Sequence, residues 1–165
     1  MLNNSVRIGI GEDSHKFSTV LKPLVLGGVT ISKEGGFKTN SDGDVILHSL
    51  CNALSSAIGG DSLGTWSDEM CLKNKITDSK EYVRVVFKKV KDNKYKIGNV
   101  SISIEAKKPY LSIEQLNKIK MSLSQILKIR FKQIGLTITS GEGLTKFGKG
   151  VGIRVSCAVL LIKNG

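Results

Sequence analysis

Residues 41–60 read SDGDVILHSLCNALSSAIGG, and this stretch predicts a turn that runs directly into a helix. Between residues 44 and 58 the apolar side chains recur at helical spacing, which places them on one face of an α-helix. The pair Gly59-Gly60 is typical of a helix C-terminus, where the backbone leaves the right-handed region. We therefore expect a helix over residues 44–58, with its apolar face turned toward a core.

Strand patterns lie on both sides of this helix. Residues 5–10 alternate and are rich in β-branched side chains, and the pattern stops at Gly11, which predicts a strand that enters a loop. Residues 23–32 predict one or two strands around a Gly27-Gly28 turn or bulge. Further strands are expected at residues 99–106, 135–140 and 152–163.

Two more helices are expected, and both begin with a capping pattern. Residues 78–91 open on Asp78 followed by Glu81, and residues 112 to about 130 open on Ser112 followed by Gln115. Residues 60–76 show no clear period and predict a long loop. This order predicts an α/β chain, more closely an α+β sandwich with a four- to five-stranded mixed sheet and helices covering one face. We expect a single domain over residues 1–165.

The net charge of the chain raises the question of a polyanionic partner. Its 165 residues include 25 Lys and Arg against 14 Asp and Glu, a formal charge of +11. Only 5% of the residues are aromatic, and they do not interleave with the basic runs as they would on a nucleic-acid stacking surface. We therefore expect no nucleic-acid partner, whereas a phosphate-rich small substrate would benefit from the positive field.

No membrane partner is expected either. The chain has no apolar run of the length that crosses a bilayer. The segment Met1–Arg7 lacks the basic and apolar regions of a signal peptide, so we expect a cytoplasmic protein.

The 2 histidines of the chain both lie in segments that suggest a metal site. Asp13 and His15 are two residues apart, so their side chains share a face wherever the backbone is extended. His48 lies on the expected helix, one turn after Asp44. Together Asp13, His15 and His48 would form a three-ligand set with one open position, the pattern of catalytic zinc. The alternative is a surface His15 and a hydrogen-bonded His48, and spacing alone does not decide between them.

A third segment, Thr139-Ser140-Gly141-Glu142-Gly143, follows the strand expected at residues 135–140. Its hydroxyl groups and backbone N–H groups suit phosphate oxygens, and Glu142 could hold a hard cation beside them. Such a sequence is more often an ordinary loop. It is neither a P-loop nor a dinucleotide-binding fingerprint, because their glycine frameworks are absent.

Taken together, these segments resemble the 2-C-methyl-D-erythritol 2,4-cyclodiphosphate synthase family. The resemblance begins at RIGIGEDSH (residues 7–15), continues through LGGV (26–29) and is most specific at SDGDVILHSL (41–50). Later matches are Asp78-Ser79, GNV (98–100), Ala106-x-x-Pro109 and AVLLIK (158–163). The matches span nearly the whole chain in one order, which favours the metal hypothesis.

The resemblance implies a homotrimer with active sites at the subunit interfaces. It implies a cytidine diphosphate substrate, 4-diphosphocytidyl-2-C-methyl-D-erythritol 2-phosphate, which the enzyme cyclises with release of CMP. This is an intramolecular phosphoryl transfer of the non-mevalonate isoprenoid pathway, catalysed by a phosphorus–oxygen lyase. The implied cofactors are one Zn²⁺ per subunit on Asp13, His15 and His48, and Mg²⁺ or Mn²⁺ on Glu142 and the substrate phosphates.

The family pattern also assigns roles to other positions. Asn40 and Ser140 take catalytic positions, and Thr139 with Ser140 matches a hydroxyl pair that binds phosphate. Asp61 aligns with an acid that binds the erythritol hydroxyls, and residues 106–111 align with a cytosine pocket. The substrate-binding set implied by the resemblance is Ser41, Asp61, Ala106, Lys108, Pro109, Tyr110, Leu111, Thr139, Ser140, Phe147 and Lys149.

The sequence departs from the family pattern at several positions, including the loop after Asp61 and Lys149, which replaces an Arg. Asn40 replaces a His that would steady the reacting phosphate, Asn52 replaces an Asp one turn after His48, and Gly143 replaces a Lys. The metal-ligand set is intact, so we expect a divergent active enzyme. The alternatives are a catalytically silent trimeric relative, an unrelated zinc hydrolase and a basic nucleic-acid-binding domain.

Overall fold

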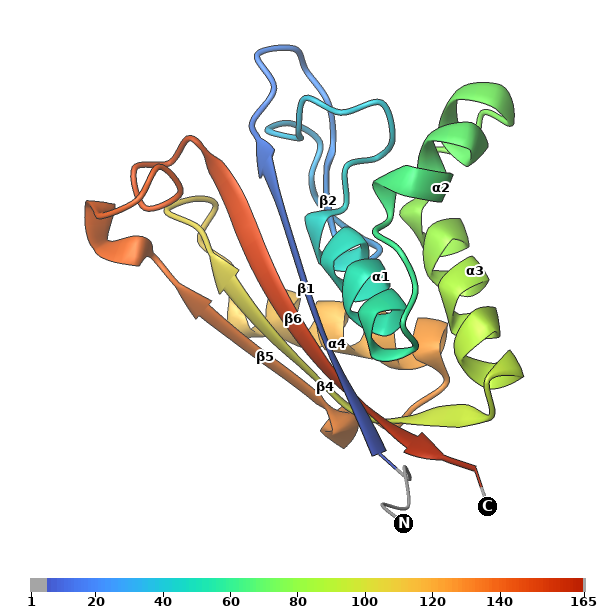
Figure 1. The fold of residues 1–165 in the computed structure, drawn as a ribbon. Coiled ribbons are helices and arrows are strands. Elements are labelled where there is room, and N and C mark those ends of the chain that lie inside the picture. The colour runs from blue at the N-terminus through green and yellow to red at the C-terminus, as the bar shows by residue number, and fades with distance from the viewer. Residues whose placement is uncertain (1–5, 165) are drawn as a thin grey trace.

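A four-stranded mixed sheet forms the frame of the protein in the computed structural model, which describes residues 6–164 (Figure 1). The strand order is β1-β6-β4-β5. Strands β4 and β5 are parallel, whereas β6 pairs antiparallel with both β1 and β4. The bounds are β1 Val6–Lys16, β4 Tyr95–Glu105, β5 Ile134–Thr139 and β6 Gly152–Lys163. The predicted mixed sheet of an α+β fold is confirmed.

A separate two-stranded ribbon consists of β2 (Leu24–Leu26) and β3 (Val29–Ser32). Its turn is Gly27-Gly28, whose φ angles of 60° and 77° favour glycine at both positions. The expectation of strands around this glycine pair is therefore confirmed. There are two strands, and both lie outside the main sheet.

Three helices cover one face of the sheet: α1 (Val45–Ala57), α3 (Ser79–Asp92) and α4 (Ile113–Leu127) (Figure 1). Asp78 caps α3, and Ser112 with Gln115 forms the predicted capping box of α4. Helix α1 lies directly on β1, because a Cβ atom at Gly9 or Gly11 would lie 2.0 or 2.3 Å from backbone atoms of Ala53. These glycines bring the backbone of α1 close to the strand.

The structure corrects the expectation that the first strand ends at Gly11. Strand β1 continues to Lys16, and its pairing with β6 runs from Val6↔Ile162 to Lys16↔Gly152. Gly11 is present for the close approach of α1 and makes no turn. As a consequence, Asp13 and His15 lie on extended backbone and share the face that α1 covers.

The structure also corrects the expected loop at residues 60–76. This segment contains α2 (Gly64–Asp68) and a helical turn at Glu69–Lys73. Leu63 is buried, and Trp66 and Met70 pack against the core, so tertiary contacts stabilise helical backbone that lacks its own apolar period. Further short helical turns lie at Phe131–Gln133 and Gly141–Gly143.

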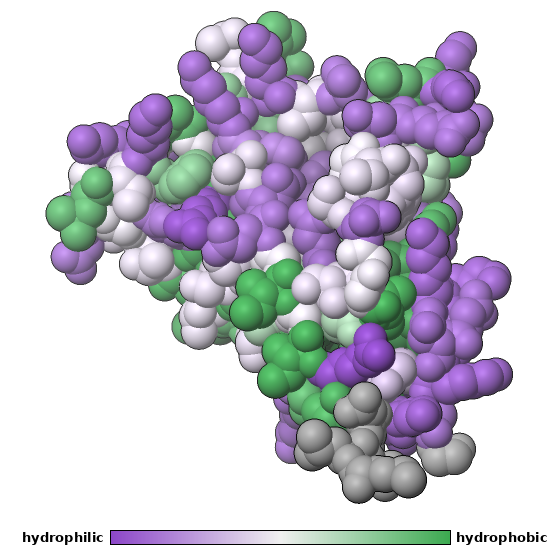
Figure 2. All heavy atoms as spheres, in the orientation of Figure 1, coloured by the Kyte–Doolittle hydropathy of each residue, from purple (hydrophilic) through white to green (hydrophobic). Residues whose placement is uncertain are grey.

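The opposite face of the sheet carries an apolar stripe that nothing in residues 6–164 covers. Val6, Ile8 and Ile10 project from it on β1 and are 50%, 69% and 66% exposed. Figure 2 shows apolar side chains gathered over the lower half of this strand. No helix within residues 6–164 is long and apolar enough to span a membrane.

Candidate metal and phosphate site

Asp13, His15 and His48 converge where the end of β1 passes the first turns of α1. His48 Nδ1 lies 3.0 Å from Asp13 Oδ2, and His15 Nε2 lies 3.1 Å from Asp13 Oδ2 and 3.1 Å from His48 Nδ1. The three side chains are partly or largely buried. Burial lowers the pKa of His15, and the charge of Asp13 acts in the opposite direction, so burial favours a neutral imidazole that can serve as a ligand.

The tautomer of the neutral His48 ring follows from the hydrogen bonds behind it. Ser79 Oγ donates its one proton to Asp42 Oδ1, and Ser79 N–H donates to Asp42 Oδ2 at 3.1 Å. Ser79 Oγ must then accept from the His48 Nε2–H group, which lies 2.8 Å away. The imidazole is thereby fixed with its Nδ1 lone pair facing Asp13 and His15.

Asp13 Oδ2, His15 Nε2 and His48 Nδ1 face one another, and too few protons lie between them to make every contact a hydrogen bond. A neutral His15 can donate one hydrogen bond at Nε2, either to Asp13 or to His48, and the remaining contacts join two acceptors. One cation would satisfy all three atoms. Zinc bound tetrahedrally at about 2.0–2.1 Å separates its ligand atoms by about 3.3 Å, close to the observed separations. The residues therefore fit a zinc ion with one corner left open.

The turn before α1 is held by a buried carboxylate. Asp44 Oδ1 accepts from the N–H groups of Gly27, Ile46 and Leu47, and Oδ2 accepts from Gly28. Burial raises the pKa of Asp44 to about 6, while the N–H groups favour its charged form. Because Asp44 joins the β2–β3 turn to the start of α1, it sets where His48 points.

Lys22 holds the segment that precedes this turn. Its Nζ donates to the carbonyl oxygens of Thr39 and Ser41 at 3.0 and 2.6 Å and to Thr39 Oγ1 at 3.1 Å. Asn40 lies between these two carbonyls with its side chain exposed. The hydroxyl of Ser41 accepts from Gly43 N–H at 3.1 Å. These contacts fix the segment that carries Asn40 and Ser41 just before the start of α1.

Two departures from the family pattern have structural explanations. Asn52 Nδ2 donates to the carbonyl oxygen of Glu12 at 3.1 Å, and Asn52 Oδ1 accepts from Leu63 N–H at 2.8 Å. An aspartate could make the second contact but not the first. Gly143 has a φ of 77°, and a lysine would be strained in that conformation.

Within one chain, the predicted phosphate loop does not lie beside the metal ligands. Thr139 is the last residue of β5, Ser140 and Glu142 follow the strand, and all three residues are exposed. Strand β5 is the edge of the sheet opposite to β1, as Figure 1 shows. Three strand spacings place these edges about 14 Å apart. Within one chain, Glu142 therefore lies at the far edge of the sheet from Asp13 and His15.

Three of the other predicted substrate residues line two cavities. Asp61 lines a cavity of about 240 Å³ with Glu12 and Asn52. Lys108 and Pro109 line one of about 270 Å³ that also includes Phe17. The remaining members of the predicted set are Ala106 and Leu111, which are buried, Tyr110 and Lys149, which are exposed, and Phe147, which is half-buried.

Sequence reasoning missed the residues that orient the ligands: Lys22, Asp42 and Ser79. Asp42 and Ser79 are 37 positions apart in the sequence. Their hydrogen bond therefore has no local sequence pattern. The available signal was the carboxylate of Asp42 in the turn before His48, since a metal-binding His commonly has a hydrogen-bond partner behind it.

Ser79→Ala is expected to weaken zinc binding about 10- to 100-fold, because the mutation frees His48 to adopt the wrong tautomer. Competition with a chromogenic chelator measures the affinity. Ser49→Ala is the matched control: Ser49 is equally buried, and its hydroxyl donates to the carbonyl oxygen of Ile46 without touching the imidazole. Equal zinc affinity in the two variants would contradict this role of Ser79.

The fold and these contacts define an α+β protein with a candidate site for one cation. The model of the YgbB family matches residues 6–162. A relative in Chlamydia felis named 2-C-methyl-D-erythritol 2,4-cyclodiphosphate synthase is 38% identical over 95% of this chain and 89% of its own length. The chain belongs to the YgbB family.

Solved structures agree with this membership. The structure titled IspF (Plasmodium falciparum) CDP complex superposes with a TM-score of 0.83 and 31% identity, covering 98% of this chain and 99% of that one. The bifunctional IspDF from Campylobacter jejuni gives a TM-score of 0.87 and 28% identity over 96% of this chain. The match spans 42% of that longer protein.

Proposed function

We propose that this enzyme of the YgbB family converts 4-diphosphocytidyl-2-C-methyl-D-erythritol 2-phosphate to 2-C-methyl-D-erythritol 2,4-cyclodiphosphate. An oxygen of the 2-phosphate attacks the β-phosphorus, the bond from that phosphorus to the bridging oxygen breaks, and CMP leaves. The name shared by the curated relatives supports this reaction, and CDP in the Plasmodium falciparum complex supports a cytidine nucleotide as partner. The observation that carries the proposal is the convergence of Asp13, His15 and His48 on one point.

The reaction needs positioning and charge neutralisation more than covalent chemistry. Asp13, His15 and His48 would hold Zn²⁺, and Glu142 would hold Mg²⁺ or Mn²⁺ with the substrate; the cations would supply a Lewis acid to phosphate oxygens. Thr139 and Ser140 donate hydroxyl hydrogen bonds to the phosphates. Asn40, next to Ser41 in the chain, donates an amide hydrogen bond to the reacting phosphate.

The remaining residues would bind the two ends of the substrate. Asp61, at the mouth of its cavity, accepts hydrogen bonds from the erythritol hydroxyl groups. The cytosine packs in the segment after β4, where Lys108 and Pro109 line the second cavity. Ala106, Tyr110 and Leu111 complete this pocket in the proposal, and Phe147 and Lys149 contribute from the glycine-rich loop.

We further infer a ring of three copies, in which the β1 edge of one chain meets the loop after β5 of the next. Two features support this assembly. The predicted site is divided between opposite edges of the sheet, and a head-to-tail ring brings unlike edges together. The stripe of Val6, Ile8 and Ile10 also leaves an apolar face to be buried. The number three follows the family resemblance.

The proposed reaction is tested by incubating the protein with the cytidyl substrate, zinc and magnesium. Chromatography then measures the CMP that is released. CMP and the cyclic diphosphate are expected in equal amounts, because one CMP leaves for each ring that closes. Bound zinc with no CMP release would instead favour a silent relative with a binding role.

Ile8→Lys is expected to convert the assembly to monomers, because it places one charge per chain in the apolar face where three chains meet. Light scattering after size-exclusion chromatography gives the mass. Leu72→Lys is the matched control, since Leu72 is 65% exposed and lies on the helical turn at Glu69–Lys73, away from the sheet. An unchanged mass for Ile8→Lys would contradict the assembly.

A further inference from the structure

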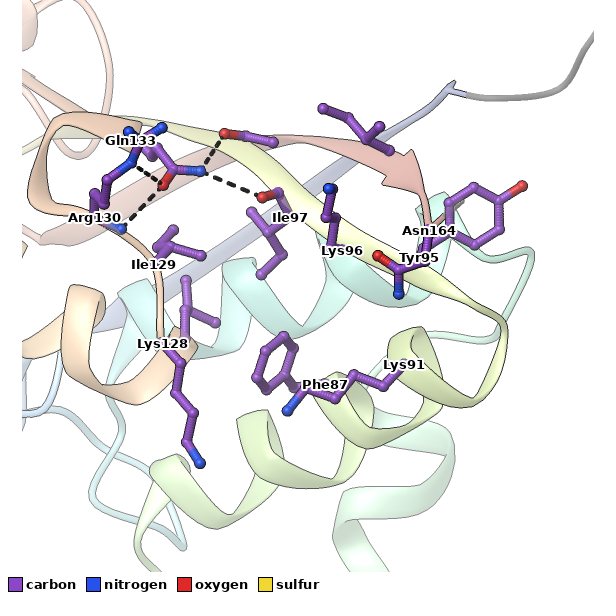
Figure 3. Close-up of a pocket in the computed structure, with 13 residues that line it drawn as sticks. Phe87, Lys91, Tyr95, Lys96, Ile97, Lys128, Ile129, Arg130, Gln133 and Asn164 are labelled. Carbon is purple, nitrogen blue, oxygen red and sulfur yellow. Dashed lines mark hydrogen bonds between the residues drawn. The ribbon is translucent and has the colours of Figure 1, made fainter.

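A different cavity, far from Asp13, His15 and His48 and here called the basic cavity, has the composition of a binding site for an anion. It has a volume of about 770 Å³ and lies between the C-terminal ends of α3 and α4 and the start of β4 (Figure 3). Its lining includes Ile162, which pairs with Val6, whereas His15 pairs with Ile153 at the other end of the same ladder. Nine residues of strand separate the two places by about 30 Å.

Four cations line this basic cavity, and its lining contains no carboxylate. They are Lys91, Lys96, Lys128 and Arg130. The ion pairs found within residues 6–164 include none of the four.

Two neighbouring cations on α3 have carboxylate partners. Arg84 pairs with Glu81, and Lys88 pairs with Asp92 at 2.7 Å. The cations of the basic cavity therefore form a group whose charge is not offset locally, in a concave place where an anion would be partly shielded from water.

The floor of the basic cavity is apolar. Phe87, Ile97, Leu127 and Ile129 contribute to it, and Figure 3 shows the ring of Phe87 and the side chain of Ile97 pointing toward one another. The ammonium of Lys91 lies 4.3 Å from the centre of the Phe87 ring. Apolar walls with a few convergent polar groups, in this range of volume, are typical of small-molecule sites.

Two features of Lys128 connect it with the basic cavity. It lines the basic cavity and also an adjoining hollow of about 340 Å³, which shares Phe87 and Lys91 with it. Its backbone is left-handed, with φ 54° and ψ 42°, at the C-cap of α4. Glycine or asparagine suits this position better than lysine, so the positive charge is kept in an unfavourable conformation.

We propose that the basic cavity binds an organic phosphate, with its phosphate group held by Lys91 and Lys128 and its apolar or aromatic part packed on Phe87, while Lys96 and Arg130 add to the positive field of the lining. The shape and chemistry favour such a ligand over a simple inorganic anion, which would leave the apolar floor unused. This site is separate from the proposed cyclisation, and its occupation does not depend on that reaction.

Backbone amide shifts in NMR spectra of the full-length protein, titrated with 1-naphthyl phosphate, test the proposal. Saturable shifts are expected at Phe87, Ile97 and Gly98, with weaker binding of inorganic phosphate and of 1-naphthol. Because these amides are remote from Asp13 and His15, binding at the metal site gives a different pattern. Saturation confined to the metal site, or no saturable shift in the basic cavity, would overturn the proposal whether or not CMP release is observed.

Lys128→Asn separates ligand binding from folding. Asparagine tolerates the left-handed backbone, so thermal stability should be unchanged or higher, while affinity for 1-naphthyl phosphate falls at least about tenfold. Lys132→Asn is the matched control, because Lys132 is exposed, close in sequence and outside the lining. An equal loss of affinity for 1-naphthyl phosphate in the two variants would contradict a specific site. Binding of single-stranded DNA that both variants weaken equally would likewise indicate a diffuse polyanion-binding surface.

Discussion

His48→Ala protein is expected to contain no bound zinc and to release CMP at least about a thousandfold more slowly than the wild type. The mutation removes one of three ligands and leaves Asp13 and His15 unable to hold the cation alone. Lewis-acid stabilisation of developing charge amounts to several kcal/mol, and each 1.4 kcal/mol is about a factor of ten in rate. Metal analysis and CMP chromatography on the same preparation measure both effects.

The control for this loss is the Ser49→Ala variant, which alters the same helix without touching a ligand. It should retain zinc and turnover. A His48→Ala enzyme that is folded, as judged by its thermal transition, and still binds one zinc per chain would contradict the assignment of His48.

Mixing two inactive variants is expected to restore activity. If the metal ligands of one chain act with Glu142 of the next, His48→Ala and Glu142→Ala each disable every site of their own assembly. Every ring of three that contains both variants has one site of its three with an intact His48 and an intact Glu142. Co-expression with two affinity tags, followed by purification through both, yields mixed rings for the CMP assay.

Two outcomes of this mixing experiment would count against an interface site. One is a mixed assembly with no more activity than its inactive parents, which would show that each site draws on one chain. The other is a Glu142→Ala enzyme with full activity, which would remove Glu142 from the site.

The parts of the fold that the sequence predicted are those with a local signal. Helix α1 has a regular apolar face and a glycine end, and α4 has its capping box at Ser112. The shared face of Asp13 and His15 also followed from a spacing of two, because strand geometry alternates side chains wherever the backbone is extended.

The parts it did not predict depend on contacts between distant segments. Gly11 marked the end of a strand by local rules, yet the pairing with β6 and the approach of α1 keep the backbone extended there. The turn at Glu69–Lys73 likewise depends on packing against the core. Local patterns carry no information on such contacts.

The candidate site shows the same division. The ligand set could be found because Asp13, His15 and His48 are chemically distinctive residues in two short segments. The hydrogen bonds of Asp42 and Ser79 fix which nitrogen of His48 faces the ligands, and they join residues that only the fold brings together. The separation of Glu142 from the ligands required the strand order.

The central claim is that Asp13 Oδ2, His15 Nε2 and His48 Nδ1 bind one zinc ion and leave a position open for a phosphate oxygen. Anomalous diffraction from crystals of the zinc-loaded protein, recorded on both sides of the zinc absorption edge, tests it most directly. One peak per chain is expected, at about 2.0–2.2 Å from all three atoms. A peak held by other residues, or no peak among these three atoms, would contradict it.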